Sequence, residues 1–168
     1  DPSSKYHKQI KDILIINGKV DKIANKIQNK PSYKLVEFEN LHVSCGWFDT
    51  SVSLGEPGYE ERETIQNGLS VASKSGFTSI ALNPNTFPVI DSKSDIEFLI
   101  NKAKNSATSL YPIGALTKES KGENMAELFD MQQSGAIAFG DYNKPIVNDN
   151  LMKIALCILM ILICLLWH

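Results

Sequence analysis

The regular alternation of β-prone runs with helical patterns after residue 60 constrains the fold of this chain most strongly. Residues 60–75 space Ile65, Leu69 and Ala72 at helical intervals and stop before Gly76, a residue suited to the end of a helix. The β-prone run FTSIAL follows at once. Parallel strands need crossover connections, so strands that alternate with helices predict a parallel sheet.

The same unit repeats four times along the chain. A second helix is predicted at the capping box of Ser94 and Glu97, leading into the strand LYPIGAL. A third is predicted from Asn124 with the strand AIAF after it, and a fourth over residues 148–156. Right-handed crossovers wind either an open sheet or a barrel, and periodicity does not separate the two. In both, ligands bind in the loops at the carboxyl ends of the strands.

The first 40 residues follow a different pattern. Residues 12–23 place two β-prone runs around Asn17-Gly18, a dipeptide that favours a type I′ hairpin. Further β-prone runs cover residues 33–38 and 41–54, the second with a bend near Gly46. We therefore expect a small β-rich element before the alternating region.

Composition limits the partners. The formal net charge of −2 gives no electrostatic footprint for nucleic acid, so small molecules or proteins are the expected partners. Cys45, Cys157 and Cys164 form no even-numbered framework, which indicates a reducing compartment, and the first residues hold no apolar signal segment. We expect a cytoplasmic protein.

Residues 49–58, DTSVSLGEPG, resemble the signature Asp-x-His-x-His-x-Arg-x-Pro-Gly of dihydroorotases, members of the amidohydrolase superfamily. The segments YEERETIQNG, NPNTFPVID and GAIAFGDYNKP are similar to the family's next helix, second-strand loop and fourth-strand loop. The resemblance covers about residues 1–156. It implies the N-terminal half of a (β/α)8 TIM-type barrel, with a β-rich element at 1–40 and four βα units at 41–156. An apolar tail, outside the resemblance, follows at 157–168.

The resemblance also implies a lost metal site. Ser51 and Ser53 stand where the family has its two metal-binding histidines, and Gly55 replaces the arginine that pairs with the substrate carboxylate. Residues two apart on a strand point to the same side, so two histidines there would converge on one ion. A serine hydroxyl is a weak zinc ligand, and no metal is therefore expected. By the same alternation we expect one face to carry Asp49, Ser51 and Ser53 and the other Phe48, Val52 and Leu54.

Two further residues are candidates through the resemblance. Asp141 falls near the family's metal-binding aspartate, and it is either a vestigial ligand with a catalytic role or an ordinary turn residue. Asn85 matches an asparagine that helps to hold the substrate carboxylate, and it either binds substrate or only shapes the turn-rich loop.

The remaining titratable residues have structural interpretations. His42 is expected at the bottom of the barrel or on the surface, and His7 and His168 lie near the chain ends. The acidic residues of the YEERE segment are expected in the first turn of the first helix, where they complement its dipole: Glu60, Glu61 and Glu63.

Residues 154–167 form an unbroken apolar run of 14 residues. At about 1.5 Å per residue this helix would reach about 21 Å, short of the ~30 Å hydrocarbon layer, so a membrane anchor is disfavoured. We hypothesise that residues 157–168 come from a truncated or frame-shifted reading.

Three functions are compatible with these residues. The first is a catalytically silent dihydroorotase-like protein of pyrimidine biosynthesis with a structural or regulatory role. Its expected protein partner is a second copy of the chain or aspartate transcarbamoylase. A dihydroorotate-like small molecule is a further candidate ligand. The second is an active zinc amidohydrolase that cleaves a cyclic amide through non-standard ligands. The third is a membrane-associated protein that uses the apolar tail.

Overall fold

The computed structural model describes residues 2–162 and 165–166 and divides into two compact units, Asp1–Cys45 and Gly46–His168. In the first unit, β1 (Asp12–Ile16) and β2 (Lys19–Ala24) form an antiparallel hairpin. Its turn residues Asn17 and Gly18 have φ angles of 50° and 74°, as a type I′ turn requires. The predicted hairpin is confirmed.

The predicted strand over residues 33–38 is wrong, because this segment pairs with no other strand. The predicted strand over residues 41–54 is shorter in the structure and begins only at Trp47. A β-prone run without a partner forms no ladder hydrogen bonds, and composition alone does not supply the partner.

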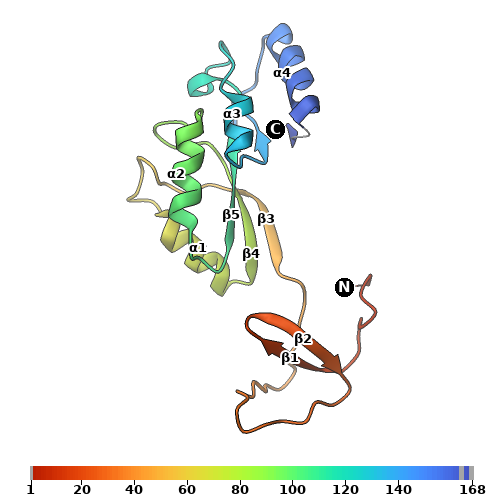
Figure 1. The fold of residues 1–168 in the computed structure, drawn as a ribbon. Helices are drawn as coiled ribbons and strands as arrows, with labels where there is room; N and C mark the ends of the chain where they lie inside the picture. The colour runs from red at the N-terminus through yellow and green to blue at the C-terminus, as the bar shows by residue number, and fades with distance from the viewer. Residues whose placement is uncertain (1, 163–164, 167–168) are drawn as a thin grey trace. The chain divides into compact units, whose positions relative to one another are not determined.

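The second unit is built on a curled parallel sheet, which matches part of a TIM barrel (Figure 1). Its strands lie in chain order, as expected when each strand is followed by a crossover. They are β3 (Trp47–Val52), β4 (Phe77–Leu82), β5 (Ser109–Gly114), β6 (Ala138–Phe139) and β7 (Leu165–Leu166).

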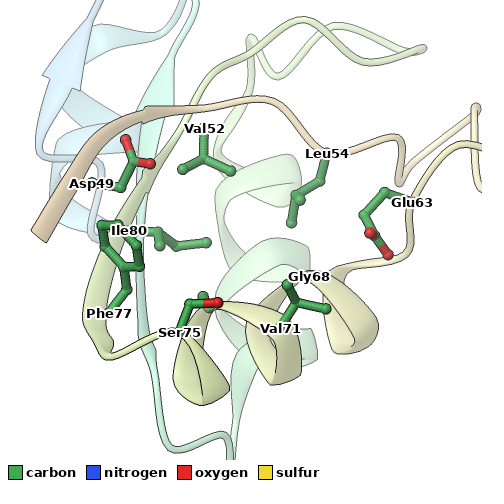
Figure 2. Close-up of a pocket in the computed structure, with 10 residues that line it drawn as sticks. Asp49, Val52, Leu54, Glu63, Gly68, Val71, Ser75, Phe77 and Ile80 are labelled. Atoms are coloured by element: carbon green, nitrogen blue, oxygen red, sulfur yellow. The ribbon is translucent and has the colours of Figure 1, made fainter. Parts of the chain in front are cut away.

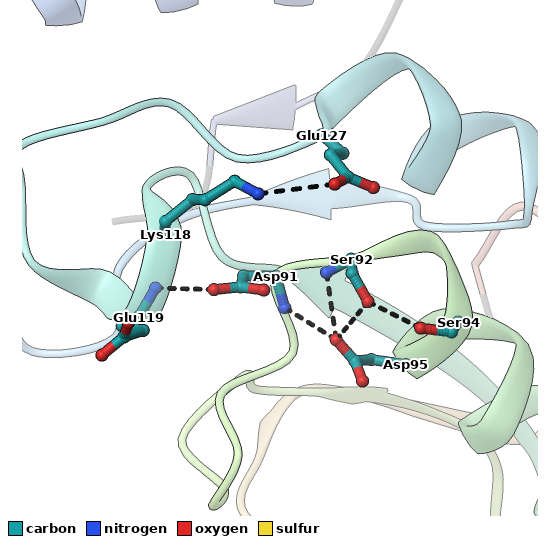
Figure 3. A network of polar contacts seen from close by, with 7 residues as sticks. All are labelled: Asp91, Ser92, Ser94, Asp95, Lys118, Glu119 and Glu127. Atoms are coloured by element: carbon teal, nitrogen blue, oxygen red, sulfur yellow. Dashed lines mark hydrogen bonds and ion pairs between the residues drawn. The ribbon is translucent and has the colours of Figure 1, made fainter.

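The first two helices follow β3 and β4. Helix α1 (Ile65–Lys74) is capped by Thr64, whose side chain accepts from Asn67 N. Helix α2 (Lys93–Ala103) begins at a capping box of Ser92 and Asp95, in which Asp95 Oδ2 accepts from Ser92 N at 3.0 Å (Figure 3). The prediction of Ser94 and Glu97 as the box is therefore wrong by two residues.

The later helices depart further from the pattern. Between β5 and β6 lie a short 3-10 turn, η1 (Lys118–Ser120), and α3 (Leu128–Gln133). Asn124 caps no helix, contrary to prediction, since its carbonyl accepts from Lys118 N at 2.8 Å in the loop after β5. Asp91 ties this loop to the start of α2 by accepting from Glu119 N at 2.6 Å (Figure 3).

Helix α4 (Asp149–Leu162) extends beyond the predicted end at residue 156 and takes in much of the apolar tail. One face is buried, through Leu151, Ala155 and Leu159, at a spacing of four residues. The other face leaves Met160 and Ile161 about four-fifths exposed, at 79% and 80%. Within the described residues, no helix has the length and apolar character needed to span a membrane.

Side chains alternate between the two faces of the sheet. Ile80 and Leu82 belong to the large core packed between the sheet and the helices, whereas Ala81 lies in a small cluster on the other face with Ile113 and Ala138. We call this other face the inner face, because it lies away from the helices. Fully burying an aliphatic side chain contributes about 1.5–3 kcal/mol, so the helix-side core supplies most of the hydrophobic stabilisation.

Candidate functional site

The first element of the site is an irregularity in β3. Asp49 pairs with Ile80 and Val52 with Leu82, so two residues of β3 stand opposite one residue of β4. Such a β-bulge reverses the facing of the residues before it. Asp49 therefore faces the helices beside Ile80, and the expectation that it shares a face with Ser51 and Ser53 is wrong.

Phe48 changes sides for the same reason. Its ring contacts the ring of Tyr111 edge to face, with centroids 5.9 Å apart. Tyr111 pairs with Ala81 and so lies on the inner face. The prediction that placed Phe48 on the helix side is wrong, because strict alternation does not account for a bulge.

Ser51 and Ser53 do share the inner face, where both contact one buried asparagine. Asn83, at the carboxyl end of β4 and 1% exposed, donates through Nδ2 to Ser51 Oγ at 3.1 Å and to Ser53 Oγ at 3.3 Å. Its Oδ1 is buried without a hydrogen-bond partner. The sequence placed Asn83 only in a turn-rich loop, and its position directly after a buried strand was the available signal.

Asn85 lies two residues further along the same loop. Its Oδ1 is also buried without a partner, so both asparagine oxygens at this strand end lack a donor. Buried amide oxygens in folded proteins are nearly always hydrogen-bonded, and each one left unpaired costs about 1–3 kcal/mol.

Asp141 follows β6 and is 8% exposed. Its Oδ1 accepts from Leu116 N at 2.9 Å and Thr117 N at 3.0 Å, and its Oδ2 accepts from the Thr117 hydroxyl. Both carboxylate oxygens are therefore engaged in fixing the loop after β5. This arrangement supports the interpretation of Asp141 as a loop-forming residue.

The loop after β3 fixes Gly55 tightly. A Cβ atom at Gly55 would lie 1.9 Å from the carbonyl oxygen of Tyr59, which is backbone and cannot rotate away. The next residue, Glu56, is 7% exposed, accepts from Ile65 N at 2.9 Å and pairs with Lys102 Nζ at 2.7 Å. The loop thus has no room for an arginine at position 55 in its present conformation.

The acidic residues of this loop precede α1 rather than opening it. The first turn of α1 contains no acidic residue, so the predicted dipole role of Glu60, Glu61 and Glu63 is wrong. Glu60 instead accepts from Gly58 N at 2.9 Å, and this hydrogen bond lowers the pKa of its carboxyl group.

Neither of the described histidines belongs to the unit that carries the parallel sheet. His42 is exposed and His7 lies in an N-terminal turn, both in the first unit. His168 and Cys164 lie outside the described residues, and Cys45 and Cys157 are free thiols.

A pocket of about 240 Å³ lies between β3 and α1, on the helix side of the sheet (Figure 2). Its lining is mostly apolar and includes Val52, Leu54, Val71 and Ile80. Asp49 also lines this pocket, which places it opposite the serine pair. The pocket therefore does not belong to the polar cluster at the strand ends.

The residues of this cluster do not fit a zinc ion. Ser51 and Ser53 offer neutral hydroxyls, and the amide that faces them presents N–H groups, which repel a cation. The oxygens of Asp141 are already engaged. Among the described residues, no three His, Cys, Asp or Glu side chains come together as a metal-binding group.

The chain matches the family model described as "Dihydro-orotase-like" over residues 42–159. The chain belongs to the dihydroorotase-like family. The match continues to residue 159, three residues into the segment that we hypothesised to be frame-shifted. The dihydroorotase-like family is one of pyrimidine biosynthesis.

Comparison with individual dihydroorotases shows how much of their length this chain covers. The chain is 41% identical to the dihydroorotase of Pelotomaculum thermopropionicum over 146 residues, covering 87% of this chain and 34% of the relative. It is 39% identical to that of Syntrophus aciditrophicus over 158 residues, covering 93% and 37%. The chain therefore spans about a third of the length of these relatives.

The fold of the chain is also similar to that of a solved structure. L-hydantoinase (dihydropyrimidinase) from Arthrobacter aurescens aligns with a TM-score of 0.68 and 16% identity, over 93% of this chain and 36% of the hydantoinase. This likeness confirms the predicted fold, a partial TIM-type barrel preceded by a β-rich element.

Proposed function

We propose that this chain is a dihydroorotase-like protein that does not carry out the hydrolytic step and has a structural or regulatory role in the cytoplasm. The observation that carries the proposal is the hydrogen-bonded cluster of Ser51, Ser53 and Asn83. It stands where the signature of the family places two metal-binding histidines.

The chemical consequence follows from what zinc supplies in such hydrolases. Bound zinc lowers the pKa of its water to about 7 and polarises the carbonyl group that is attacked. Serine and asparagine side chains are neutral and can do neither. Gly55 further removes the charge-assisted contact that an arginine would make with a substrate carboxylate.

A structural role calls for a protein partner, and we propose aspartate transcarbamoylase or a second copy of the chain. The exposed edge of β3 and the exposed apolar face of α4 both support association. Pull-down with purified aspartate transcarbamoylase tests the first partner, and retention of the chain only in the presence of that enzyme is the expected result.

The second candidate function is an active zinc amidohydrolase that cleaves dihydroorotate or a related cyclic amide. It is favoured by the identity of about 40% with dihydroorotases and by the otherwise intact signature frame at Asp49, Pro57 and Gly58. In that case the ligands would be non-standard.

An assay of dihydroorotate formation and hydrolysis, with and without added zinc, separates the two candidates. The first predicts no turnover above the uncatalysed rate under either condition. Zinc-dependent turnover that disappears when Asp141 is replaced by alanine would favour the second.

A further inference from the structure

The pocket between β3 and α1 lies on the helix side of the sheet, away from the serine pair (Figure 2). One wall is β3 and the residues after it, from Asp49 to Leu54, and the other is one face of α1, from Gly68 to Ser75. At about 1.5 Å per residue, the helical wall is about 10 Å long. Val71 in this wall is 50% exposed, so the pocket is open to solvent along α1.

The pocket has a carboxylate at each end. Asp49 begins the part of β3 that lines it, where the β-bulge turns this side chain toward the helices. At the other end, the carbonyl oxygen of Glu63 accepts from Gly55 N at 2.9 Å, one residue after Leu54. Figure 2 shows Asp49 and Glu63 on opposite sides of the apolar lining. The pocket is therefore an apolar channel between two negative charges.

Each carboxylate is only partly engaged by the chain itself. Asp49 Oδ1 accepts from Ser51 N at 3.1 Å, and Glu63 Oε1 accepts from Asn67 Nδ2 at 2.8 Å. Neither carboxylate takes part in an ion pair within the part of the chain that the structure describes. Both side chains are half-buried, so a cation that enters the pocket meets charges that are partly shielded from water.

These features define the chemistry of the ligand. The apolar lining favours a methylene chain, and two carboxylates about 10 Å apart favour a cationic group at each end of that chain. A single metal ion does not fit, since its oxygen ligands lie within about 2.6 Å of it. An anionic ligand would be repelled at both ends.

We propose that this pocket binds an aliphatic diamine. The methylene chain lies along Val52, Leu54 and Ile80, and the two ammonium groups pair with Asp49 and Glu63. The inference does not rest on the proposed function, because the pocket and the serine pair lie on opposite faces of the sheet.

NMR titration of the full ¹⁵N-labelled chain tests the inference with three probes that share one apolar body: terminal diaminooctane, octylamine and terminal octanediol. The backbone amide signals of Gly68, Val71 and Ala72 report on the pocket. For diaminooctane we expect a saturable shift with a dissociation constant on the order of millimolar. Octylamine is expected to bind about threefold more weakly and octanediol about tenfold more weakly, since they lack one or both charges.

The variants Asp49→Asn and Glu63→Gln remove one charge each and keep the side-chain oxygen that accepts the hydrogen bond. Each is expected to weaken diaminooctane binding about threefold, and the double variant about tenfold. Binding of octanediol should stay unchanged in all three, which shows that the pocket remains intact.

The matched control is Glu123→Gln/Asp130→Asn, which removes two charges at exposed positions outside the pocket lining. It should bind diaminooctane as the unaltered chain does.

Three results would overturn the inference. The first is the absence of a saturable response at the pocket, including a response confined to the exposed apolar residues Met160 and Ile161 of α4. The second is equal affinity for diaminooctane and octanediol. The third is a double variant that still prefers the diamine as strongly as the unaltered chain.

Discussion

At the scale of single residues, three neutral side chains decide the chemistry at the strand ends. Replacing imidazole by hydroxyl at positions 51 and 53 exchanges strong nitrogen ligands for groups that prefer hydrogen bonds. Asn83 then completes the cluster by donating to both serines. The loop after β3 adds a steric element, because Gly55 is enclosed by the backbone of Tyr59.

We predict that Gly55→Ala destabilises the chain by about 3 kcal/mol or more. Its Cβ would lie 1.9 Å from a backbone oxygen, so the loop must be displaced. Gly76→Ala is the control, since its φ of 90° carries a penalty of about 1–2 kcal/mol but its Cβ would have no neighbour within 4 Å. Urea denaturation followed by circular dichroism gives both free energies of unfolding, and equal losses would contradict the steric account.

At the scale of elements, the sequence predicted the alternation of strands and helices well, because buried strands and amphipathic helices have distinct periods. Phe77–Leu82 is a strand with the bounds that the β-prone run predicted. The start of α2 was harder to predict. Ser92 and Ser94 are each followed three residues later by an acidic residue, so both serines fit the capping-box pattern.

The polar cluster could be predicted only in part. The two-residue alternation of side chains along a strand correctly predicted that Ser51 and Ser53 share a face. The bulge that reverses the facing of Asp49 and Phe48 depends on the pairing of β3 with β4, so the sequence pattern of β3 does not reveal it. Asn83 was not predicted because it lies in a segment of residues that commonly form turns. Its contact with the serines joins positions about 30 residues apart, which one sequence does not reveal.

The start of α2 yields a second prediction. Ser92→Ala should lower the free energy of unfolding by about 1 kcal/mol, because it breaks the capping box with Asp95. Ser94→Ala should change it by no more than about 0.5 kcal/mol, since the exposed Ser94 side chain contacts only the Ser92 hydroxyl. Thermal or urea unfolding of the two variants side by side measures the difference. A larger loss of unfolding free energy in Ser94→Ala than in Ser92→Ala would support the capping box of Ser94 and Glu97 that was predicted from the sequence.

At the scale of the whole molecule, the second unit resembles a barrel that is present only in part. It aligns with 36% of a hydantoinase, and β3 has an unpaired edge in the described sheet. Helix α4 adds exposed apolar side chains on its outer face. Exposed strand edges and apolar surfaces both favour association with other chains.

We predict that the chain self-associates and that Met160→Lys/Ile161→Lys reduces this association at least severalfold. The two side chains are 79% and 80% exposed, so lysine adds charge there without disturbing the core. The variant Gln133→Lys/Asn150→Lys adds the same charge at exposed polar positions and should associate like the unaltered chain. Sedimentation velocity over a range of concentrations reports the association state, and a compact monomer throughout would refute the prediction.

The zinc content of the purified chain, grown and dialysed with zinc present, tests the absence of a metal site most directly. We predict far less than one ion per chain, with no change in the Ser51→Ala/Ser53→Ala variant. One tightly held zinc ion per chain that is lost in this variant would contradict the account.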